Sequence, residues 1–202
     1  MKKDFDIIIH SPFKDIAVID YGIVKGNNKI VFIKAGQDGS MYGYENKYLK
    51  IATSINDKYG YTVICSSNPF DGTNPLDNAM DVIENYCKDN NYKDYEIYYM
   101  GTSNGGIIGA QFGFNYPKIK RMILINAPLM INLHKTKEGI KSFKGDKIVL
   151  IYGSLDQSYM YVELIKPLLN DVVKLKIIEG QDHFFSKDTY DFKKLPEDYL
   201  LN

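Results

Sequence analysis

Residues 95–105 of this 202-residue chain read YEIYYMGTSNG, and this stretch decides the fold. Apart from Glu96, its first six residues are aromatic or aliphatic, which predicts a strand. The last five, Gly101–Gly105, form a G-x-S-x-G motif, and the residues after it predict a helix that ends before Pro117. The motif therefore lies between a strand and a helix, with Ser103 at the sharp turn, as a nucleophile elbow requires.

Glycines flank this turn for a steric reason. Side chains at positions 101 and 105 would collide there, so only glycine is expected to fit. At the start of a helix, the Ser103 hydroxyl would also meet backbone N–H groups and the positive end of the helix dipole. An ordinary N-cap serine on a glycine-rich turn is the competing interpretation. A P-loop is not indicated, because no Gly-Lys-Ser/Thr follows.

Segments typical of strands and helices alternate on both sides of the motif. Apolar, β-branched and aromatic runs predict strands at about 5–10, 15–24, 29–34, 61–65, 95–100, 121–125, 148–152 and 172–178. Helices are predicted from after residue 40 to about 58, and at 76–88, 104–115, 158–169 and from about 187.

This alternation predicts an α/β fold in a single domain that spans residues 1–202. The first two strands, separated by Ser11 and Pro12, are expected to pair antiparallel. The whole is expected to form a mostly parallel sheet of about eight strands with helices on both faces. Because such sheets bind ligands beyond the carboxyl ends of their strands, catalytic residues are expected in the loops that follow strands.

A reactive serine needs a base, and the chain contains three histidines. His183 lies in the sequence EGQDHFF, just past the last predicted strand, where a base has to be. His10 lies in the opening strand and is interpreted as structural. His134 lies in a polar connecting segment, where a position on the surface or at a pocket rim is expected. A neutral histidine packed against the two following phenylalanines is the alternative for His183.

The base in turn needs an orienting carboxylate. Asp156 meets this need, because it follows the strand at 148–152 by a turn that contains Gly153. An N-cap for the segment that begins near 158 is the alternative role of this aspartate. Asp182 and Glu179 are the substitutes, although neighbouring side chains such as those of residues 182 and 183 seldom face each other in a loop.

Taken together, these residues resemble the α/β-hydrolase superfamily over nearly the whole chain. The elbow at Gly101–Gly105, the turn at Gly153–Asp156 and the late Gly180 and His183 match the superfamily in type, order and strand context. The resemblance implies a triad of Ser103, Asp156 and His183 that needs no metal or cofactor. Many members insert a helical cap after the sixth strand, whereas residues 127–146 leave room here for little or no cap. The site is therefore expected to be open, and the candidate pocket-lining residues, with plain packing as the alternative for each, are Tyr42, Tyr44, Met130, Leu133 and Phe184.

Two backbone donors are expected to hold the oxyanion that develops on the substrate. One is the N–H of Asn104, directly after the nucleophile. The other is assigned to Gln37, in the loop after the third strand. The sequence departs from many superfamily members here, because Ala35 and Gly36 stand where those members carry His-Gly. A flexible turn without this role is the alternative.

Composition bears on the binding partners, the cysteines and the location of the protein. The 25 basic and 25 acidic residues balance, so nothing indicates a nucleic acid or an anionic membrane surface as a partner. Cys65 and Cys87 form no C-x-x-C pair and are interpreted as buried thiols. The apolar run after Lys2 and Lys3 is too short for a signal peptide, and no stretch is long enough to span a membrane. A cytoplasmic location is expected.

The sequence thus predicts a serine hydrolase that cleaves a carboxylic ester or thioester of a small acyl substrate. An acyltransferase or a peptidase with the same triad is the alternative among enzymes. From another class, a binding protein for a small ligand could retain the hydrolase scaffold without catalysis. Composition and motifs leave the substrate and the oligomeric state open.

Overall fold

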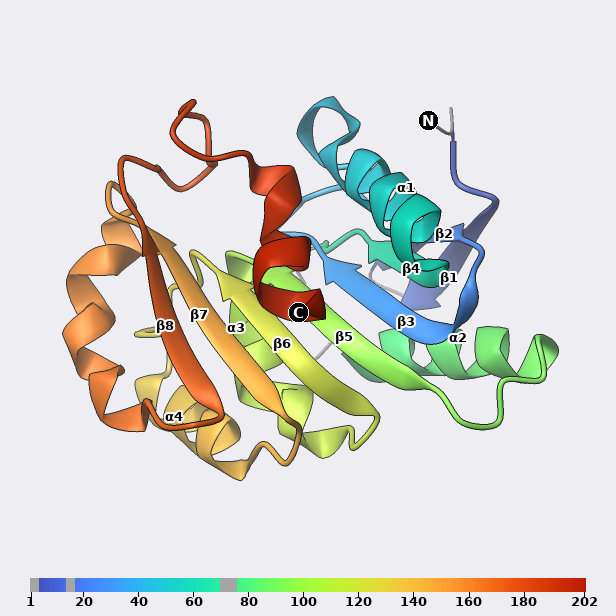
Figure 1. The fold of residues 1–202 in the computed structure, drawn as a ribbon. Coiled ribbons are helices and arrows are strands. Elements are labelled where there is room, and N and C mark those ends of the chain that lie inside the picture. Colours follow the sequence, from blue (N-terminus) through green and yellow to red (C-terminus); the bar gives the residue numbers. More distant parts are fainter. Residues whose placement is uncertain (1–3, 14–16, 70–75) are drawn as a thin grey trace.

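The computed structural model describes residues 4–13, 17–69 and 76–202. The strands within these ranges form one eight-stranded sheet, in the order β1-β2-β4-β3-β5-β6-β7-β8 (Figure 1). They are β1 (Ile7–Phe13), β2 (Ala17–Val24), β3 (Asn27–Lys34), β4 (Tyr61–Ser66), β5 (Glu96–Thr102), β6 (Ile119–Ile125), β7 (Lys147–Gly153) and β8 (Val173–Ile178). β1 pairs antiparallel with β2 and β2 with β4, while every other pair is parallel. The predicted sheet is confirmed; residues 15 and 16 of the second predicted strand lie outside the described residues. The predicted break at Ser11 and Pro12 is wrong, because both residues belong to β1 and pair with Ile19 and Val18 of β2.

Helices cover both faces of the sheet. α2 (Leu76–Asp89), α3 (Asn104–Phe112) and α4 (Leu133–Ser142) lie on one face. α1 (Lys47–Tyr59) and the C-terminal helical turn Pro196–Leu201 lie on the other (Figure 1).

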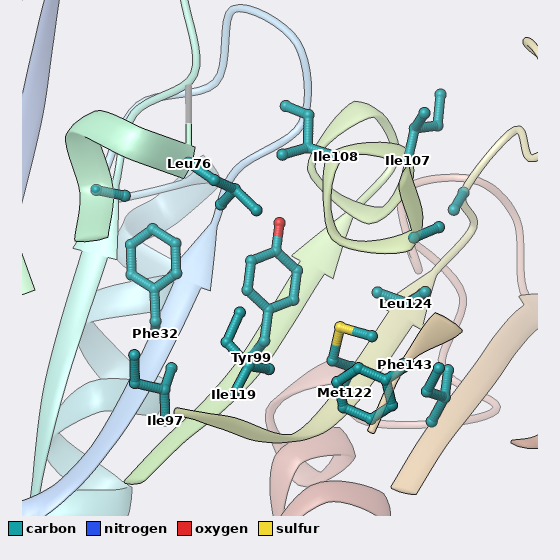
Figure 2. Packing of buried hydrophobic residues seen from close by; sticks show 14 of the residues in the cluster. Phe32, Leu76, Ile97, Tyr99, Ile107, Ile108, Ile119, Met122, Leu124 and Phe143 are labelled. Carbon is teal, nitrogen blue, oxygen red and sulfur yellow. The ribbon is translucent and has the colours of Figure 1, made fainter. Parts of the chain in front are cut away.

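The central strands contribute alternate side chains to two separate cores. On β5, Tyr99 points toward the face of α2 and α3, whereas Tyr98 and Met100 belong to the core under α1. Figure 2 shows Tyr99 beside Phe32 of β3, and their ring centroids lie 5.7 Å apart. Because both faces are buried, the central strands read as continuous apolar runs, which is why the sequence pattern revealed them.

The helix expected at 158–169 is wrong in type. The chain instead forms two 3₁₀ segments, Gln157–Leu164 and Lys166–Leu168. Val162, Ile165 and Leu168 are the buried apolar residues here, and their spacing of three fits the three residues per turn of a 3₁₀ helix.

Two other helices begin later than predicted. α1 starts at Lys47, because Glu45 and Asn46 have φ angles of 50° and 58°, which an α-helix cannot contain. The closing helix was expected from about 187, but the helical turns begin only at Phe192. The Gln181 side chain holds the intervening loop, since its Nε2 donates to the carbonyl of Lys187 and to the Thr189 hydroxyl.

The parallel strands bring their carboxyl ends to one edge, so the loops after β3, β5, β7 and β8 lie close together. The segment between β6 and β7 contains helix α4, which packs against α3. Gly139 of α4 lies so close to α3 that a Cβ there would be 2.1 Å from the Ala110 carbonyl oxygen. Little or no cap was predicted for the segment between β6 and β7, and its helix α4 lies on the face of the sheet. Across the described ranges, the helices are all too short or too polar to cross a membrane.

Candidate active site

The turn between β5 and α3 places Ser103 above the sheet in a strained conformation. Its φ of 50° and ψ of −118° lie in a region that residues other than glycine rarely adopt. The flanking glycines are required for the reason expected. A Cβ on Gly101 would lie 2.4 Å from the carbonyl oxygen of Gly105, and a Cβ on Gly105 would lie 2.5 Å from that of Ala35. The strained turn is therefore held by backbone packing on both sides.

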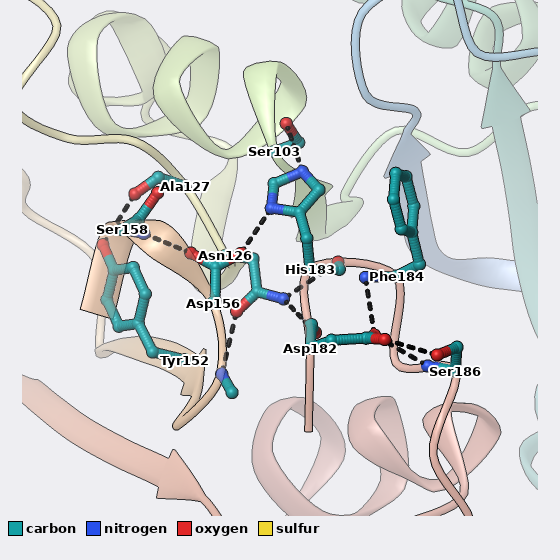
Figure 3. A network of polar contacts seen from close by, with 11 residues as sticks. Ser103, Asn126, Ala127, Tyr152, Asp156, Ser158, Asp182, His183, Phe184 and Ser186 are labelled. Atoms are coloured by element: carbon teal, nitrogen blue, oxygen red, sulfur yellow. Dashed lines mark hydrogen bonds and ion pairs between the residues drawn. The ribbon is translucent and has the colours of Figure 1, made fainter. Parts of the chain in front are cut away.

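Three of the predicted residues meet in one chain of hydrogen bonds (Figure 3). The His183 Nε2 atom lies 3.1 Å from the Ser103 hydroxyl oxygen. On the other side of the ring, Nδ1 bonds to Oδ2 of Asp156. Because a carboxylate can only accept, Nδ1 carries the proton and Nε2 is left to accept from the serine. This is the arrangement by which a base can take the proton of an attacking hydroxyl.

Asp156 makes the contacts of both roles considered for it. Its Oδ1 accepts from the backbone N–H of Ser158 at 2.6 Å, as an N-cap does, while Oδ2 meets His183. The side chain is fully buried, whereas that of His183 is 37% exposed. The cap therefore fixes the carboxylate in the orientation that the histidine needs, and substrate can still reach the imidazole.

The other candidate bases and acids lie elsewhere. His10 is exposed and bonds to Asp20 on the neighbouring strand at 2.7 Å, and His134 is exposed on α4. Asp182 accepts hydrogen bonds from the Ser186 side chain and backbone N–H and from the N–H of Phe184, and these bonds lower the pKa of its carboxyl. Asp182 therefore closes the turn after His183 and does not serve as its partner.

The loop after β3 lies directly against the nucleophile. A Cβ on Gly36 would be 3.3 Å from the Cβ of Ser103, so the neighbouring Gln37 is close to where a substrate carbonyl would sit. Among the described residues, the backbone N–H groups of Gln37 and Asn104 have no hydrogen-bond partner. Both donors proposed for the oxyanion are thus unoccupied, as a preorganised site requires.

Asn68, in the loop after β4, holds this arrangement. Its Nδ2 donates to the carbonyl of Ala35 at 3.1 Å and to the side-chain oxygen of Asn104 at 2.9 Å. Its backbone accepts from Asp38 and donates to Gly39, at 2.8 and 2.9 Å. One buried asparagine therefore links the loop that carries Gln37 to the start of α3.

Asn126, which follows β6, links the turn that leads to Asp156 with the loop that carries His183. Its Nδ2 donates to the carbonyls of Asp182 and His183, at 3.0 and 2.9 Å, and its Oδ1 accepts from the N–H of Gly153 at 2.9 Å. Figure 3 shows Asn126 between the two loops. The residue is 1% exposed and has a φ of 47°, which asparagine tolerates better than most residues.

Sequence reasoning missed both asparagines, although a usable signal was present. Each follows a strand at its carboxyl end, which is the rule that pointed to Ser103, Asp156 and His183 as candidates. Pocket-lining residues were predicted only in part. Tyr44 and Phe184 do line one cavity, but Met130 and Leu133 border a separate hollow, and Tyr42 packs on Phe5.

The two cysteines are buried and unpaired, Cys65 in β4 and Cys87 in α2. Burial raises the pKa of both thiols, that of Cys87 to about 11. In the part of the chain that the structure describes, no group of three His, Cys, Asp or Glu side chains is placed to hold a metal ion.

Comparison with known proteins supports the fold from structure alone. No protein-family model matches the chain, and no curated protein matches it in sequence. Solved structures do resemble it. Est1E from Butyrivibrio proteoclasticus aligns with a TM-score of 0.71 and 15% identity, over 90% of this chain and 92% of its own. An α/β serine hydrolase homologue from Coxiella burnetii aligns with a TM-score of 0.69 and 13% identity, over 96% and 97%.

An esterase from Pyrococcus furiosus also aligns with a TM-score of 0.69, at 13% identity, over 96% of this chain and 92% of its own. Together with the strand order and the elbow, these similarities define the class: the chain has the α/β-hydrolase fold. At such low sequence identities, structural similarity establishes the fold only. The reaction that the protein catalyses has to be inferred from the geometry of the site.

Proposed function

We propose that this protein is a serine hydrolase that cleaves a carboxylic ester or thioester through an acyl-enzyme on Ser103. The observation that carries the proposal is the continuous hydrogen-bonded chain from Ser103 through His183 to the buried Asp156. Such a chain on a strained turn, with two unoccupied backbone donors beside it, has the parts that acyl transfer needs.

In this mechanism the Ser103 oxygen attacks the substrate carbonyl while Nε2 of His183 takes the hydroxyl proton. The negative charge that develops on the carbonyl oxygen is held by the N–H groups of Gln37 and Asn104. When the tetrahedral intermediate collapses, His183 gives its proton to the leaving alcohol or thiol. Water then attacks the acyl-enzyme by the same steps, and Asp156 stabilises the imidazolium each time.

A fluorophosphonate tests the nucleophile directly. We expect the intact mass of the wild type to rise by one adduct, and that of Ser103→Ala to stay unchanged. A peptide map should place the adduct on Ser103. If the folded wild type takes no adduct, the serine is not activated, and a role in binding a small ligand replaces catalysis.

Esters, thioesters and anilides of the same acyl group, with and without an added amine or alcohol acceptor, then define the reaction. Release of free acid from the ester or thioester supports the proposal. Preferred cleavage of the anilide would indicate a peptidase, and preferred transfer to the acceptor would indicate an acyltransferase.

A further inference from the structure

A cavity of about 910 Å³ opens beside the proposed catalytic histidine. Phe184 forms part of its wall, and the ring of this residue meets the His183 ring edge-on, with 5.2 Å between centroids. The remaining walls come from the start of α1 with the turn before it, and from residues 185–193. A ligand against the Phe184 ring would therefore lie one side chain away from His183.

Charge is distributed unevenly over the wall of this cavity. The two charged residues that are half-buried are Lys47 and Lys50, both on the first turn of α1. The carboxylates of the wall, those of Glu45, Asp188 and Asp191, all belong to exposed residues. The other two lysines of the wall, Lys187 and Lys193, are also exposed. Their positive charges offset those of the exposed carboxylates at the rim. The interior of the cavity thus carries positive charge, while the rim is mixed.

Lys47 is the group that most needs an anion. Its Nζ lies 4.5 Å from the ring centroid of Phe192 and 5.3 Å from that of Tyr48, and burial lowers the pKa of the ammonium group. Within the described ranges it forms no ion pair, unlike Lys193 at the rim, which lies 3.6 Å from Asp191. A partly desolvated cation without a counter-ion is costly, and an anionic ligand would offset that cost.

Exposed aromatic rings complete the wall. Tyr44 and Phe184 are 80% and 76% exposed, although large apolar side chains gain by burial. They offer a ligand two apolar faces in the same wall as the half-buried lysines. The matching ligand has an apolar body with a negative charge at its far end.

We propose that this cavity binds the carboxylate-bearing end of the substrate, so that the enzyme prefers esters with a carboxylate several atoms from the scissile bond. The proposal rests on the hydrolase function proposed above. The competing explanation is that the Lys47 stem only covers Phe192, as lysine stems often cover apolar surface.

Matched ester pairs test the preference on both sides of the scissile bond. On the acyl side, 4-nitrophenyl esters of glutarate, adipate and suberate are compared with those of the alkanoates of equal length. On the alcohol side, 4-acetoxybenzoate is compared with 4-acetoxybenzamide. We expect kcat/KM to favour the carboxylate at least about tenfold in one series, with a smaller preference at high salt.

Lys47→Met separates charge from packing, because methionine keeps an apolar stem. We expect it to remove most of the preference, measured within each pair as the ratio of kcat/KM for the carboxylate ester to that for the neutral ester, and Lys47→Arg to retain the preference. Lys193→Met is the matched control, since it removes a lysine that is paired at the rim, and it should leave the preference intact. An equal preference in Lys47→Met and wild type would overturn the proposal, as would the absence of any preference in an enzyme that cleaves the neutral esters.

A binding measurement makes the result independent of turnover. The Ser103→Ala protein is titrated calorimetrically with 4-acetoxybenzoate and with adipate, and then with their neutral amides. Tighter binding of the carboxylates that is lost on adding Lys47→Met supports the cavity assignment even if the fluorophosphonate test fails. Equal binding of acids and amides by a protein that does react with fluorophosphonate refutes the assignment and leaves the hydrolase function standing.

Discussion

Replacing Asn126 by glycine should lower turnover strongly, although this residue is not one of the proposed reacting groups. The asparagine side chain makes three hydrogen bonds of 2.9–3.0 Å to backbone groups of the acid and histidine loops. Glycine removes these bonds but accepts the φ of 47° without strain, whereas alanine would add about 1–2 kcal/mol of backbone strain. Glycine is therefore the cleaner substitution.

The expected loss of stability follows from the backbone groups that lose their hydrogen-bond partner. Each buried polar group without a partner costs about 1–3 kcal/mol, and water entering the gap offsets part of this. We expect the free energy of unfolding to fall by about 3 kcal/mol, measured by urea denaturation. Because the lost bonds join the Asp156 turn to the His183 loop, a shift of about 1 Å between them should lower kcat about 100-fold. KM for a short neutral ester should change little.

Gln111→Ala is the matched control for this prediction. Gln111 is 7% exposed, and its Nε2 donates to the Ile131 carbonyl and the Thr136 hydroxyl, at 3.0 and 3.1 Å, between α3 and α4. It should lose similar stability and keep its kcat. If Asn126→Gly keeps kcat within about twofold of the wild type while it loses stability as the control does, the residue is structural only, and the positioning argument is refuted.

Three further perturbations have expected outcomes. Asp156→Asn keeps an oxygen to cap Ser158 but cannot fix the histidine tautomer, so kcat should fall about 10⁴-fold in a steady-state ester assay, and a smaller loss than tenfold would contradict its role. Gly105→Ala places a Cβ within 2.5 Å of two carbonyl oxygens, so urea denaturation should show a loss of about 3 kcal/mol or more; unchanged stability would show that the turn can relax. Because burial raises the pKa of Cys65 and Cys87, both thiols stay protonated at pH 8, and iodoacetamide should label them only in urea; two adducts on the native protein would contradict this.

The elements that the sequence predicted well are those decided by local chemistry. A strand buried on both faces has to be apolar along its whole length, so runs such as the one that ends at Met100 were visible directly. The turn at Ser103 was visible because only glycine fits at positions 101 and 105, where an added Cβ would lie within 2.5 Å of a backbone carbonyl oxygen. In both cases a steric or hydrophobic demand restricts the residue type at the position itself.

The elements that it predicted poorly depend on partners far away in the chain. Gln181 holds residues 187–190 in a loop through its side chain, which no helical period in that segment could reveal. Between residues 157 and 168, the choice of a 3₁₀ helix over an α-helix depended on which apolar residues the rest of the fold buries. Asn68 and Asn126 act through hydrogen bonds across loops, and an asparagine after a strand looks the same in sequence whether or not it forms them.

The strand order explains how two asparagines can connect the loops of the candidate site. The proposed reacting groups follow β3, β5, β7 and β8, while Asn68 follows β4 and Asn126 follows β6. β4 lies beside β3, so Asn68 can reach the oxyanion loop and Asn104 together. β6 lies beside β5 and β7, so Asn126 can reach the acid turn and, across it, the histidine loop. β4 and β6 thus carry no proposed catalytic group, but each is followed by an asparagine that links the loops that do. A shift in the register of β4 or β6 would therefore separate the proposed catalytic groups.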